Sequence, residues 1–597
     1  MKKLFILSLL FYSCPAFSQT NEAYAPLIQN IGGRSTQSLN GHWNRLVDPL
    51  ESGYYDYRKK PNPNGFFKNP TVDNWEQFKE YGFEDAPVLK VPGDWNTQEE
   101  KLYYYEGTIW YRKSFTYSGK AARQFLYFGA INYEAKVYLN GQKVGEHVGG
   151  YTPFNMEVTK VVNQGQNELI VMVDNKRHTD GIPTDNFDWW NYGGITRDVM
   201  LVETPSTFIR DYKVQLKKGS KSLLQVEIKL DGNKVQQKVN LEIPELKLNK
   251  SVVTGAGGEV AFEQNISATL WSPSNPKLYR VILSTDADKV EDEIGFRTIE
   301  TSGNKILLNG SPIFLKGICI HEEAPIRTGR AFSLADSRNL LDMAQKLGVN
   351  YLRLAHYPHN EYMVREAERR GILLWSEIPV YWTIDFENPV TLANATNQLS
   401  EMISRDKNRA AVIFWSVANE TPHGEARSKF LTSLVKSAKV FDNTRLVSMA
   451  LEKSQINDSL QTVNDDMMDQ VEVVSFNEYL GWYQGTWELP LKVKWQFKND
   501  KPIIISEFGG EALYGHHGTT HQRWTEEYQE QLYKNMCSML DKMPNLVGTT
   551  PWILMDFRSS KRLLPKIQDD FNRKGLFSDR GEPKKAMYIL RDWYLKK

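Results

Sequence analysis

The chain has 597 residues, 41% of them hydrophobic and 12% aromatic, which is enough to bury several cores and predicts roughly three domains. Its 73 lysines and arginines and its 72 aspartates and glutamates leave a formal net charge of +1. This balance lacks the strongly basic character typical of proteins that bind nucleic acid or an anionic membrane surface, so a neutral or locally recognised ligand is expected.

The first 18 residues have the pattern of a secretory signal. Two lysines precede an apolar run from Leu4 to Tyr12, and small residues then lead to Ser18. This pattern predicts cleavage near Ser18 and an exported protein, either periplasmic or secreted. A lipid anchor on Cys14 is the alternative, although the residues before it are a poor context for lipid attachment.

Nothing after the signal predicts a membrane span, because no later stretch reaches about 18 consecutive apolar residues. After cleavage near Ser18, only Cys319 and Cys537 remain. Two thiols in so long an exported chain do not form a disulfide framework, so hydrophobic cores must supply the stability.

Residues 19–298 predict two consecutive all-β domains. Residues 19–204 contain short alternating runs such as "GTIWYRKSFTY" and "QFLYFGAI", and "LNGQ" at 139–142 has the Asn-Gly signal of a tight hairpin. These features predict an antiparallel β-sandwich. Residues 205–298 continue with similar runs over about 95 residues, the size of an immunoglobulin-like sandwich.

From residue 299 to residue 597 the pattern changes to alternating helices and strands. "SLADSRNLLDMAQKLG" begins with Ser333 and Asp336 as a helix-capping box, and "VNYLRLAHYP", "EYMVREAERRG" and "ILLWSEIPVYW" follow as strand, helix and strand. The strands are continuous apolar runs, as in a parallel sheet buried on both faces. About 300 residues of such units predict a (β/α)8 TIM barrel. A doubly wound sheet is the alternative, but no glycine-rich phosphate turn opens a unit.

Two of the apolar strands end in a carboxylate. "AVIFWSVANETP" ends on Asn419 and Glu420, and "KPIIISEFGGEA" ends on Glu507. Because the carboxyl ends of barrel strands form the floor of the active site, both glutamates are expected in one pocket. The alternative, a solvated residue at a strand end, explains one of them readily but not both.

Several segments, in order, resemble the signature segments of glycoside hydrolase family 2. They are "NYLRLAHYPHNEYMVREAERRGILLWSEIP", "VIFWSVANET" and "IIISEFGG" in the barrel, and "DWWNYGGITRDV", which is similar to the family's amino-terminal sugar-binding domain. The resemblance covers nearly the whole mature chain. It implies a multidomain β and α/β protein: a jelly-roll β-sandwich, an immunoglobulin-like β-sandwich and a C-terminal TIM barrel, with no cofactor.

The resemblance also implies roles in a retaining glycoside hydrolase. Glu420 corresponds to the acid/base and Glu507 to the nucleophile, and such enzymes hold the two carboxyl groups about 5 Å apart. Arg353 and Tyr479 resemble residues that donate hydrogen bonds to the nucleophile. Asn419 resembles the residue that contacts the sugar 2-hydroxyl.

Further side chains resemble family contacts with the sugar. His321 and His356 end barrel strands, and neither is spaced from a second ligand as a metal site requires, so no catalytic metal is expected. The contacts implied by the resemblance are Asp188, His321, His356, Asn477, Trp482, Tyr483 and Trp552.

The sugar is predicted from "NRK" at 572–574. Asn572 and Lys574 resemble the Asn-x-Lys motif with which β-glucuronidases of the family hold the sugar carboxylate, and an ammonium with an amide donor suits that group. One departure is Gln568, where some of these enzymes have arginine. The resemblance therefore implies release of terminal β-linked glucuronic acid from an oligosaccharide or conjugate, derived from a polysaccharide if export is correct. A β-galactosidase, a β-galacturonidase and a non-catalytic carbohydrate-binding protein stay open as alternatives, as does a homo-oligomer.

Overall fold

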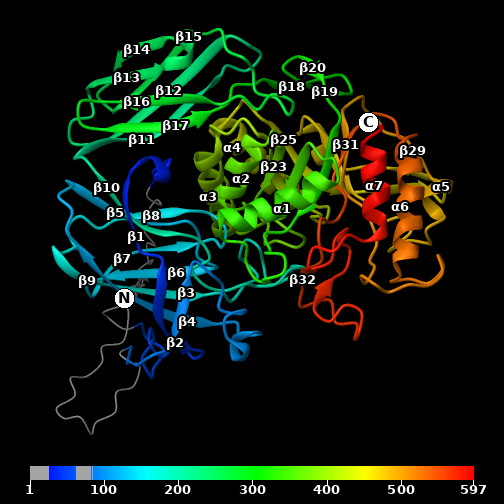
Figure 1. Cartoon of the computed structure of the whole chain (residues 1–597), viewed down its shortest axis with the longest axis horizontal. Helices are drawn as coiled ribbons and strands as arrows, with labels where there is room; N and C mark the ends of the chain where they lie inside the picture. Colours follow the sequence, from blue (N-terminus) through cyan, green and yellow to red (C-terminus); the bar gives the residue numbers. More distant parts are fainter. Residues whose placement is uncertain (1–25, 62–81, 84) are drawn as a thin grey trace, which may run out of the picture.

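The computed structural model describes residues 26–61, 82–83 and 85–597. The described chain forms two β-sandwiches and a barrel (Figure 1). The second sandwich lies above the first in this view, and the barrel lies to the right of both. The predicted signal, with Cys14 and Ser18, lies outside the described residues.

The first sandwich consists of a six-stranded and a four-stranded antiparallel sheet. In spatial order, the six-stranded sheet contains β3 (Val88–Val91), β2 (Gly41–Asp48), β4 (Thr108–Tyr117), β9 (Gly165–Asp174), β6 (Glu134–Leu139) and β7 (Gln142–Val148). The four-stranded sheet contains β1 (Ser35–Ser38), β10 (Val199–Thr204), β5 (Arg123–Phe128) and β8 (Phe154–Glu157).

The predicted hairpin joins β6 to β7. Asn140 and Gly141 are its two turn residues, with φ of 49° and 79°. Both are in the left-handed region that a two-residue hairpin turn requires, which explains the Asn-Gly pair.

The second sandwich also consists of two antiparallel sheets, with fewer strands than the first. One sheet contains β11 (Thr207–Leu216), β12 (Leu223–Gly232) and β15 (Glu259–Asn265), and the other contains β14 (Leu248–Val253), β13 (Lys238–Ile243), β16 (Tyr279–Ser284) and β17 (Lys289–Ile294). Along β12 the burial alternates, so that Leu224, Val226 and Ile228 face the core between the sheets.

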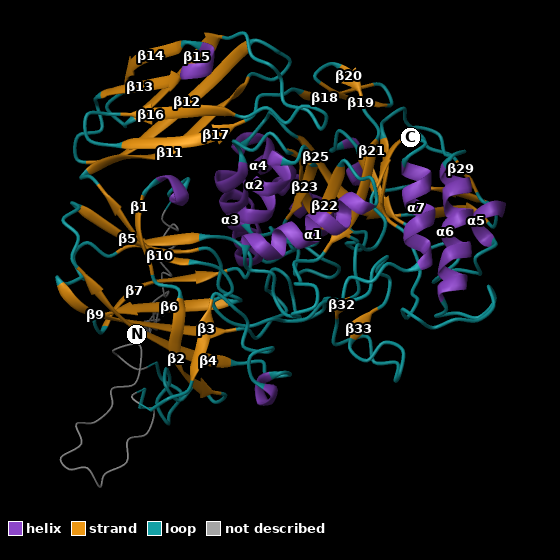
Figure 2. Ribbon diagram, viewed as in Figure 1, coloured by secondary structure: helices purple, strands orange, loops and turns teal. Residues whose placement is uncertain are grey.

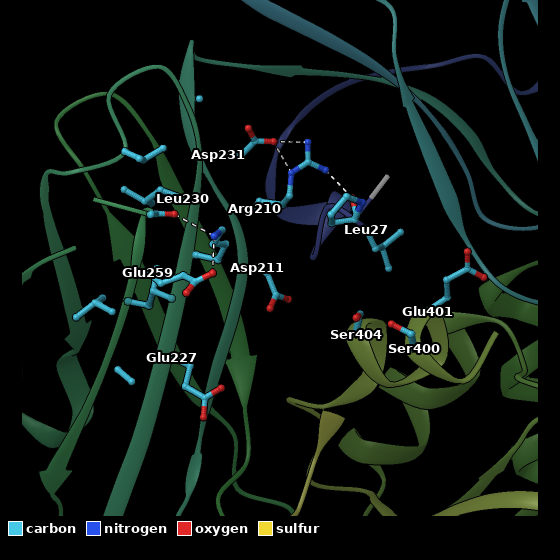
Figure 3. A pocket seen from close by; sticks show the side chains of 18 of the residues that line it. Leu27, Arg210, Asp211, Glu227, Leu230, Asp231, Glu259, Ser400, Glu401 and Ser404 are labelled. Carbon is cyan, nitrogen blue, oxygen red and sulfur yellow. Dashed lines mark hydrogen bonds and ion pairs between the residues drawn. The ribbon is translucent and has the colours of Figure 1, made fainter. Parts of the chain in front are cut away.

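A cavity of about 1010 Å³ lies where the two sandwiches and the barrel meet. Figure 3 shows Leu27 of the first sandwich and Arg210 of the second facing Ser400 and Ser404 of a barrel helix. Arg210 is paired with Asp231 across the cavity wall.

Eight parallel strands close into a barrel, as predicted. A small sheet of β18 (Ile299–Ser302), β19 (Lys305–Leu308) and β20 (Ser311–Pro312) precedes it. The barrel strands are β21 (Leu315–Ile320), β22 (Tyr351–Leu354), β23 (Leu373–Glu377), β24 (Val412–Asn419), β25 (Leu446–Glu452), β28 (Val474–Asn477), β30 (Ile503–Glu507) and β31 (Leu546–Thr549). All eight residues of β24 are buried, which explains its continuous apolar run.

Helices cover the outside of the barrel (Figure 2). They are α1 (Leu334–Lys346), α2 (Glu361–Arg369), α3 (Pro389–Asp406), α4 (Glu425–Phe441), α5 (Leu489–Lys492), α6 (Glu526–Leu540) and α7 (Lys585–Tyr594). Ser333 and Asp336 form the predicted capping box of α1. Within the described ranges, no helix is both long enough and apolar enough to cross a membrane.

Short elements complete the chain. They are η1 (Ile31–Gly33), η2 (Glu100–Leu102), η3 (Pro244–Leu246), η4 (Asp466–Asp469), β26 (Ser454–Asn457), β27 (Leu460–Thr462), β29 (Lys494–Trp495), β32 (Phe557–Arg558) and β33 (Phe571–Asn572). The loop between β32 and β33, residues 559–570, reaches the first sandwich: Tyr104 there donates a hydrogen bond to Asp570. We call this segment the rim loop.

A buried ion cluster joins the first sandwich to the barrel. Glu322, the second residue after β21, lies 2.9 Å from the guanidinium of Arg197 and 3.4 Å from that of Arg330. Arg197 also donates to the carbonyl of Pro358, 2.7 Å away. Burial acts to raise the pKa of Glu322, but the two arginine charges outweigh it and lower that pKa. The cluster therefore fixes the first sandwich against the mouth of the barrel.

Replacing Glu322 should destabilise the whole assembly. Glu322→Ala leaves two buried guanidinium groups without their carboxylate, and breaking a buried pair in this way costs about 3–5 kcal/mol. We expect the midpoint of urea unfolding to fall markedly. The matched control is Glu425→Ala, which removes an exposed partner of Lys429 and should leave the midpoint unchanged. Equal midpoints for the two variants would contradict the assigned role of the cluster.

Candidate active site

The ends of three barrel strands bring carboxylate and amide side chains together. Asn419 ends β24 and Glu420 follows it directly, Asn477 ends β28, and Glu507 ends β30. Asn477 and Glu507 are direct neighbours in the parallel pairing. The Asn477 amide donates to Asn419 (3.1 Å) and to Glu420 (2.8 Å), so one amide of β28 bonds both side chains at the end of β24.

Glu507 is held from both sides of its carboxylate. Arg353 of β22 donates to Oε1 at 2.7 Å, and the Tyr479 hydroxyl donates to Oε2 at 2.6 Å. The predicted partners of this glutamate therefore contact it directly. Because both of its oxygens are already bonded, the orientation of the carboxylate is fixed before any ligand binds.

Arg353 is completely buried and connects the strands. Besides Glu507, it donates to Glu377 at 3.0 Å and to the Asn419 side-chain oxygen at 2.8 Å. Burial acts to raise the pKa of Glu377, but the Arg353 charge and the hydrogen bond with His356 outweigh it and hold that pKa at about 2. One buried cation thus faces two carboxylates.

Glu420 is in a different environment. Its Oε1 accepts from Asn477, and its Oε2 accepts from the indole nitrogen of Trp382 at 2.9 Å. Burial is the main cause that raises the pKa of Glu420 to about 7, and the charge of Glu507 adds to it. Its φ of 47° is in the left-handed region, where a non-glycine residue is strained and often functional. The site thus pairs a carboxyl that can hold a proton near neutral pH with one bonded to a guanidinium, which suits general acid catalysis beside a nucleophile.

Aromatic rings form a wall beside the carboxylates. His356 stacks on Trp552, with ring centroids 4.7 Å apart, and its Nδ1 lies 2.9 Å from Glu377. His321 meets the edge of Trp552 at 5.2 Å. Burial lowers the pKa of His321 well below its usual value, so its ring is neutral. The buried His321 Nε2 and Asn419 Nδ2 have no hydrogen-bond partner among the described residues, so each retains unused hydrogen-bonding capacity.

A second polar cluster contains Asn572 and Lys574. Lys574 is only 1% exposed, and its ammonium lies 2.8 Å from the Tyr483 hydroxyl and 3.3 Å from Glu511. Burial acts to lower the pKa of Lys574, but Tyr483 and Glu511 outweigh it and raise that pKa. Asn572 accepts from the Lys574 backbone. The Lys574 ammonium also lies 5.5 Å from the ring of Tyr479, which bonds Glu507, so this cluster adjoins the carboxylates.

Asp188 comes from the first sandwich and contacts the rim loop. It accepts a hydrogen bond from Ser559 at 2.5 Å and forms an ion pair with Arg562. Arg562 in turn lies 3.9 Å from Glu511. The wall of the site is therefore shared between two domains.

The structure places Trp482 apart from the other predicted contacts. Its ring is 3% exposed, belongs to the hydrophobic core of the barrel, and packs against Trp524 and Tyr528 at 5.0 and 6.1 Å. Its neighbour Tyr483 is 60% exposed. This packing favours a structural role for Trp482.

Comparison with family models matches the chain along almost its whole length. Residues 37–205 match the sugar-binding domain of glycosyl hydrolases family 2, residues 207–297 match the family's middle domain, and residues 299–596 match its TIM barrel domain. The chain belongs to glycoside hydrolase family 2. It is thus a glycoside hydrolase, built from the family's sugar-binding, immunoglobulin-like and barrel domains.

Relatives of the hydrolase share most of its length. It is 27% identical to a β-glucuronidase of Paenibacillus borealis, over 94% of this chain and 96% of that protein. It is 30% identical to a β-glucuronidase of Streptococcus agalactiae, over 84% and 90%. Among solved structures, a β-galacturonidase of Eisenbergiella tayi with bound glycerol is 25% identical, with a TM-score of 0.78 over 94% and 97%.

The structure of the hydrolase also adds residues that the sequence did not indicate. Trp382 follows β23 without a local motif, and Glu377 ends that strand as Glu507 ends its own, so position alone was a usable signal for Glu377. Glu511 and Arg562 gave no signal, because their partners lie far away in the sequence. No group of three or more potential metal-ligating side chains occurs in the part of the chain that the structure describes.

The pH dependence of the hydrolase should report the environment of Glu420. Since the acid must be protonated, kcat/KM should fall as the pH rises above about 7. The Trp382 hydrogen bond lowers the pKa of Glu420, so Trp382→Phe should move this alkaline limb upward. A bond of about 1 kcal/mol corresponds to roughly 0.7 pH unit. A profile of kcat/KM against pH measures it, with Trp524→Phe as the control. A limb that stays in place or moves downward in Trp382→Phe would refute the assignment.

Proposed function

We propose that the protein is a retaining, exo-acting β-glucuronidase. The observation that carries this proposal is the buried Lys574 ammonium, which adjoins the carboxylate pair through Tyr479. A buried cation of this kind suits the carboxylate of a uronic acid, whereas a neutral sugar offers it no charged partner. The β-glucuronidases among the relatives support the same conclusion.

The reaction follows from the two environments of the carboxyl groups. Glu420, protonated near neutral pH, donates its proton to the glycosidic oxygen while Glu507 attacks the anomeric carbon and forms a covalent glycosyl-enzyme. Water then attacks the same carbon, and Glu420 takes the proton of that water. Arg353 and Tyr479 orient Glu507 for the attack, and Asn419 is placed to donate to the sugar.

The uronate carboxylate must share Lys574 with Glu511. In the free protein, Glu511 neutralises the buried ammonium, and Gln568 and the Arg573 backbone bond the other oxygen of Glu511. Gln568, the departure from the glucuronidase pattern, therefore donates a hydrogen bond to Glu511, the counterion of Lys574. Asn572, adjacent and 1% exposed, supplies the neutral amide of the same site.

Variants of the carboxylate pair test the mechanism. Glu507→Gln should abolish turnover. Glu420→Ala should slow poor leaving groups by about 10²–10⁴-fold, but activated nitrophenyl glucuronides less, because these need little protonation. Single-turnover rates over a series of leaving groups provide the measurement. Equal losses across the series would argue against Glu420 as the acid.

Lys574 tests the uronide specificity. Lys574→Ala removes a charge-assisted contact from a desolvated carboxylate and should lower kcat/KM on the β-glucuronide by roughly 30- to 1000-fold. Hydrolysis of a neutral β-glycoside, if measurable, should fall far less, which separates recognition from misfolding. Unchanged glucuronide kinetics would sink the assignment.

A β-galacturonidase is the second candidate, because the solved β-galacturonidase of Eisenbergiella tayi shares the fold over nearly the full length. Both sugars have the carboxylate, and they differ only in the configuration at C4. Initial rates on nitrophenyl β-glucuronide, β-galacturonide and β-galactoside decide between the candidates. A preference for the galactoside would reject a uronidase altogether.

We further propose an exported enzyme that acts on a terminal β-glucuronide of a polysaccharide-derived oligosaccharide or of a smaller conjugate. The secretory pattern of residues 1–18 supports export. A short connection, residues 383–388, joins Trp382 to α3, so that segment is too short to form a lid, which suits an oligosaccharide substrate.

A further inference from the structure

Trp382 borders the space that the leaving group occupies. Its indole nitrogen donates to Glu420 at 2.9 Å. Because the acid delivers its proton to the oxygen of the departing group, a side chain bonded to that carboxyl lies next to the group that departs. Tyr381 packs on the same indole with ring centroids 4.5 Å apart, which fixes the ring in place.

A lysine of the rim loop lies over this indole. The ammonium of Lys561 is 5.1 Å from the centroid of Trp382. It also donates a hydrogen bond to the side-chain oxygen of Asn186, which belongs to the first sandwich. A loop of one domain and a side chain of another thus place a cation over the indole that bonds the catalytic acid.

The two lysines of the site lie over aromatic rings that bond different members of the carboxylate pair. Lys574 lies over Tyr479, which bonds Glu507, the nucleophile. Lys561 lies over Trp382, which bonds the acid. If Lys574 binds the sugar whose anomeric carbon is attacked, Lys561 is placed to contact the leaving group.

The two cations differ in their counterions. Lys574 is paired with Glu511, and Arg562, next to Lys561, is paired with Asp188. Among the residues that the structure describes, no carboxylate lies within ion-pair distance of the Lys561 ammonium, and its partner Asn186 is neutral. Lys561 is also exposed. Its charge is therefore available to a ligand.

We propose that Lys561, with Trp382 and Asn186, forms a leaving-group subsite for an anionic substituent, either a sulfate ester or a carboxylate, on the sugar next to the cleaved bond. The inference rests on the proposed function, since it extends the substrate of that reaction. The subsite is partly open to solvent, so its contribution is modest: about three- to tenfold in kcat/KM, weakening as salt rises.

Matched disaccharides test the proposal. They carry β-glucuronic acid linked to N-acetylglucosamine, to its 6-sulfate, or to a second uronic acid, so that the leaving oxygens have similar basicity. The wild-type enzyme should prefer one or both anionic disaccharides over the neutral one, and which of them it prefers identifies the substituent. Lys561→Gln should bring the ratio of kcat/KM on the preferred anionic disaccharide to that on the neutral one close to one, whereas Lys561→Arg should retain the preference.

Two further variants separate charge from structure. Asn186→Ala removes the neutral partner of Lys561 but keeps the cation, so the preference for the anionic substrate should persist. If Lys561 only ties the two domains together, Asn186→Ala and Lys561→Gln should behave alike, and the proposal falls. Lys566→Gln, which removes another exposed lysine of the rim loop, should leave both activity and preference as they are.

A binding measurement keeps this proposal separate from the glycone assignment. N-acetylglucosamine 6-sulfate and the unsulfated sugar, titrated by ligand-observed NMR, report the subsite without turnover. Absence of glucuronide hydrolysis would refute the proposed function and leave this readout intact. Equal binding of charged and neutral sugars by the wild-type protein, or a preference that survives Lys561→Gln, would overturn the subsite.

Discussion

The geometry of the site depends on the buried guanidinium of Arg353. It contacts Glu507, Glu377 and Asn419, which come from three different barrel strands. Without it, two buried carboxylates would face each other with no cation between them, and such charges are strongly destabilised in a low-dielectric interior. The same guanidinium also separates the two catalytic environments, because it bonds Glu507 and not Glu420. Glu420 feels the negative charge of its neighbour and little positive charge.

Charges of alternating sign extend from this centre to the edge of the pocket. Asp188, Arg562, Glu511 and Lys574 follow one another, each paired with or close to the next. Each side chain is thereby oriented by its neighbours before a sugar arrives, which lowers the ordering entropy that binding must overcome. Since Asp188 belongs to the sandwich and the others to the barrel, this orientation requires that the two domains are docked.

Much of this architecture follows from local sequence rules. The turn at Asn140 and Gly141 and the cap at Ser333 are set by residues within a few positions, and the structure confirms both. The positions of Glu420 and Glu507 were predictable because the carboxyl end of an apolar barrel strand lies at the pocket. Trp482 and Tyr483 show where local sequence rules fail. They are adjacent in one loop, and no periodicity tells which ring packs into the core and which meets solvent.

The contacts that the sequence could not supply are those between distant segments. Glu511 and Lys574 are 63 positions apart with no pattern that links them, and the partners of Asp188 lie more than 370 positions away. Trp382 was missed for another reason, since its significance depends on the position of its indole nitrogen relative to Glu420. Pairings of this kind depend on tertiary packing and become visible only in the folded chain.

The rim loop has a consequence for how the enzyme can diversify. The proposed chemistry is located on barrel strands whose side chains are buried and mutually bonded, so a substitution there disturbs several contacts at once. The rim loop leaves Lys561, Leu563 and Leu564 exposed and attaches to the sandwich through a few side-chain contacts. The exposed positions of this loop can change in sequence and alter which conjugates are accepted, while Arg562 and Gln568 keep their contacts with the sugar site. After gene duplication, changes confined to the rim loop are therefore a route to a new leaving-group specificity.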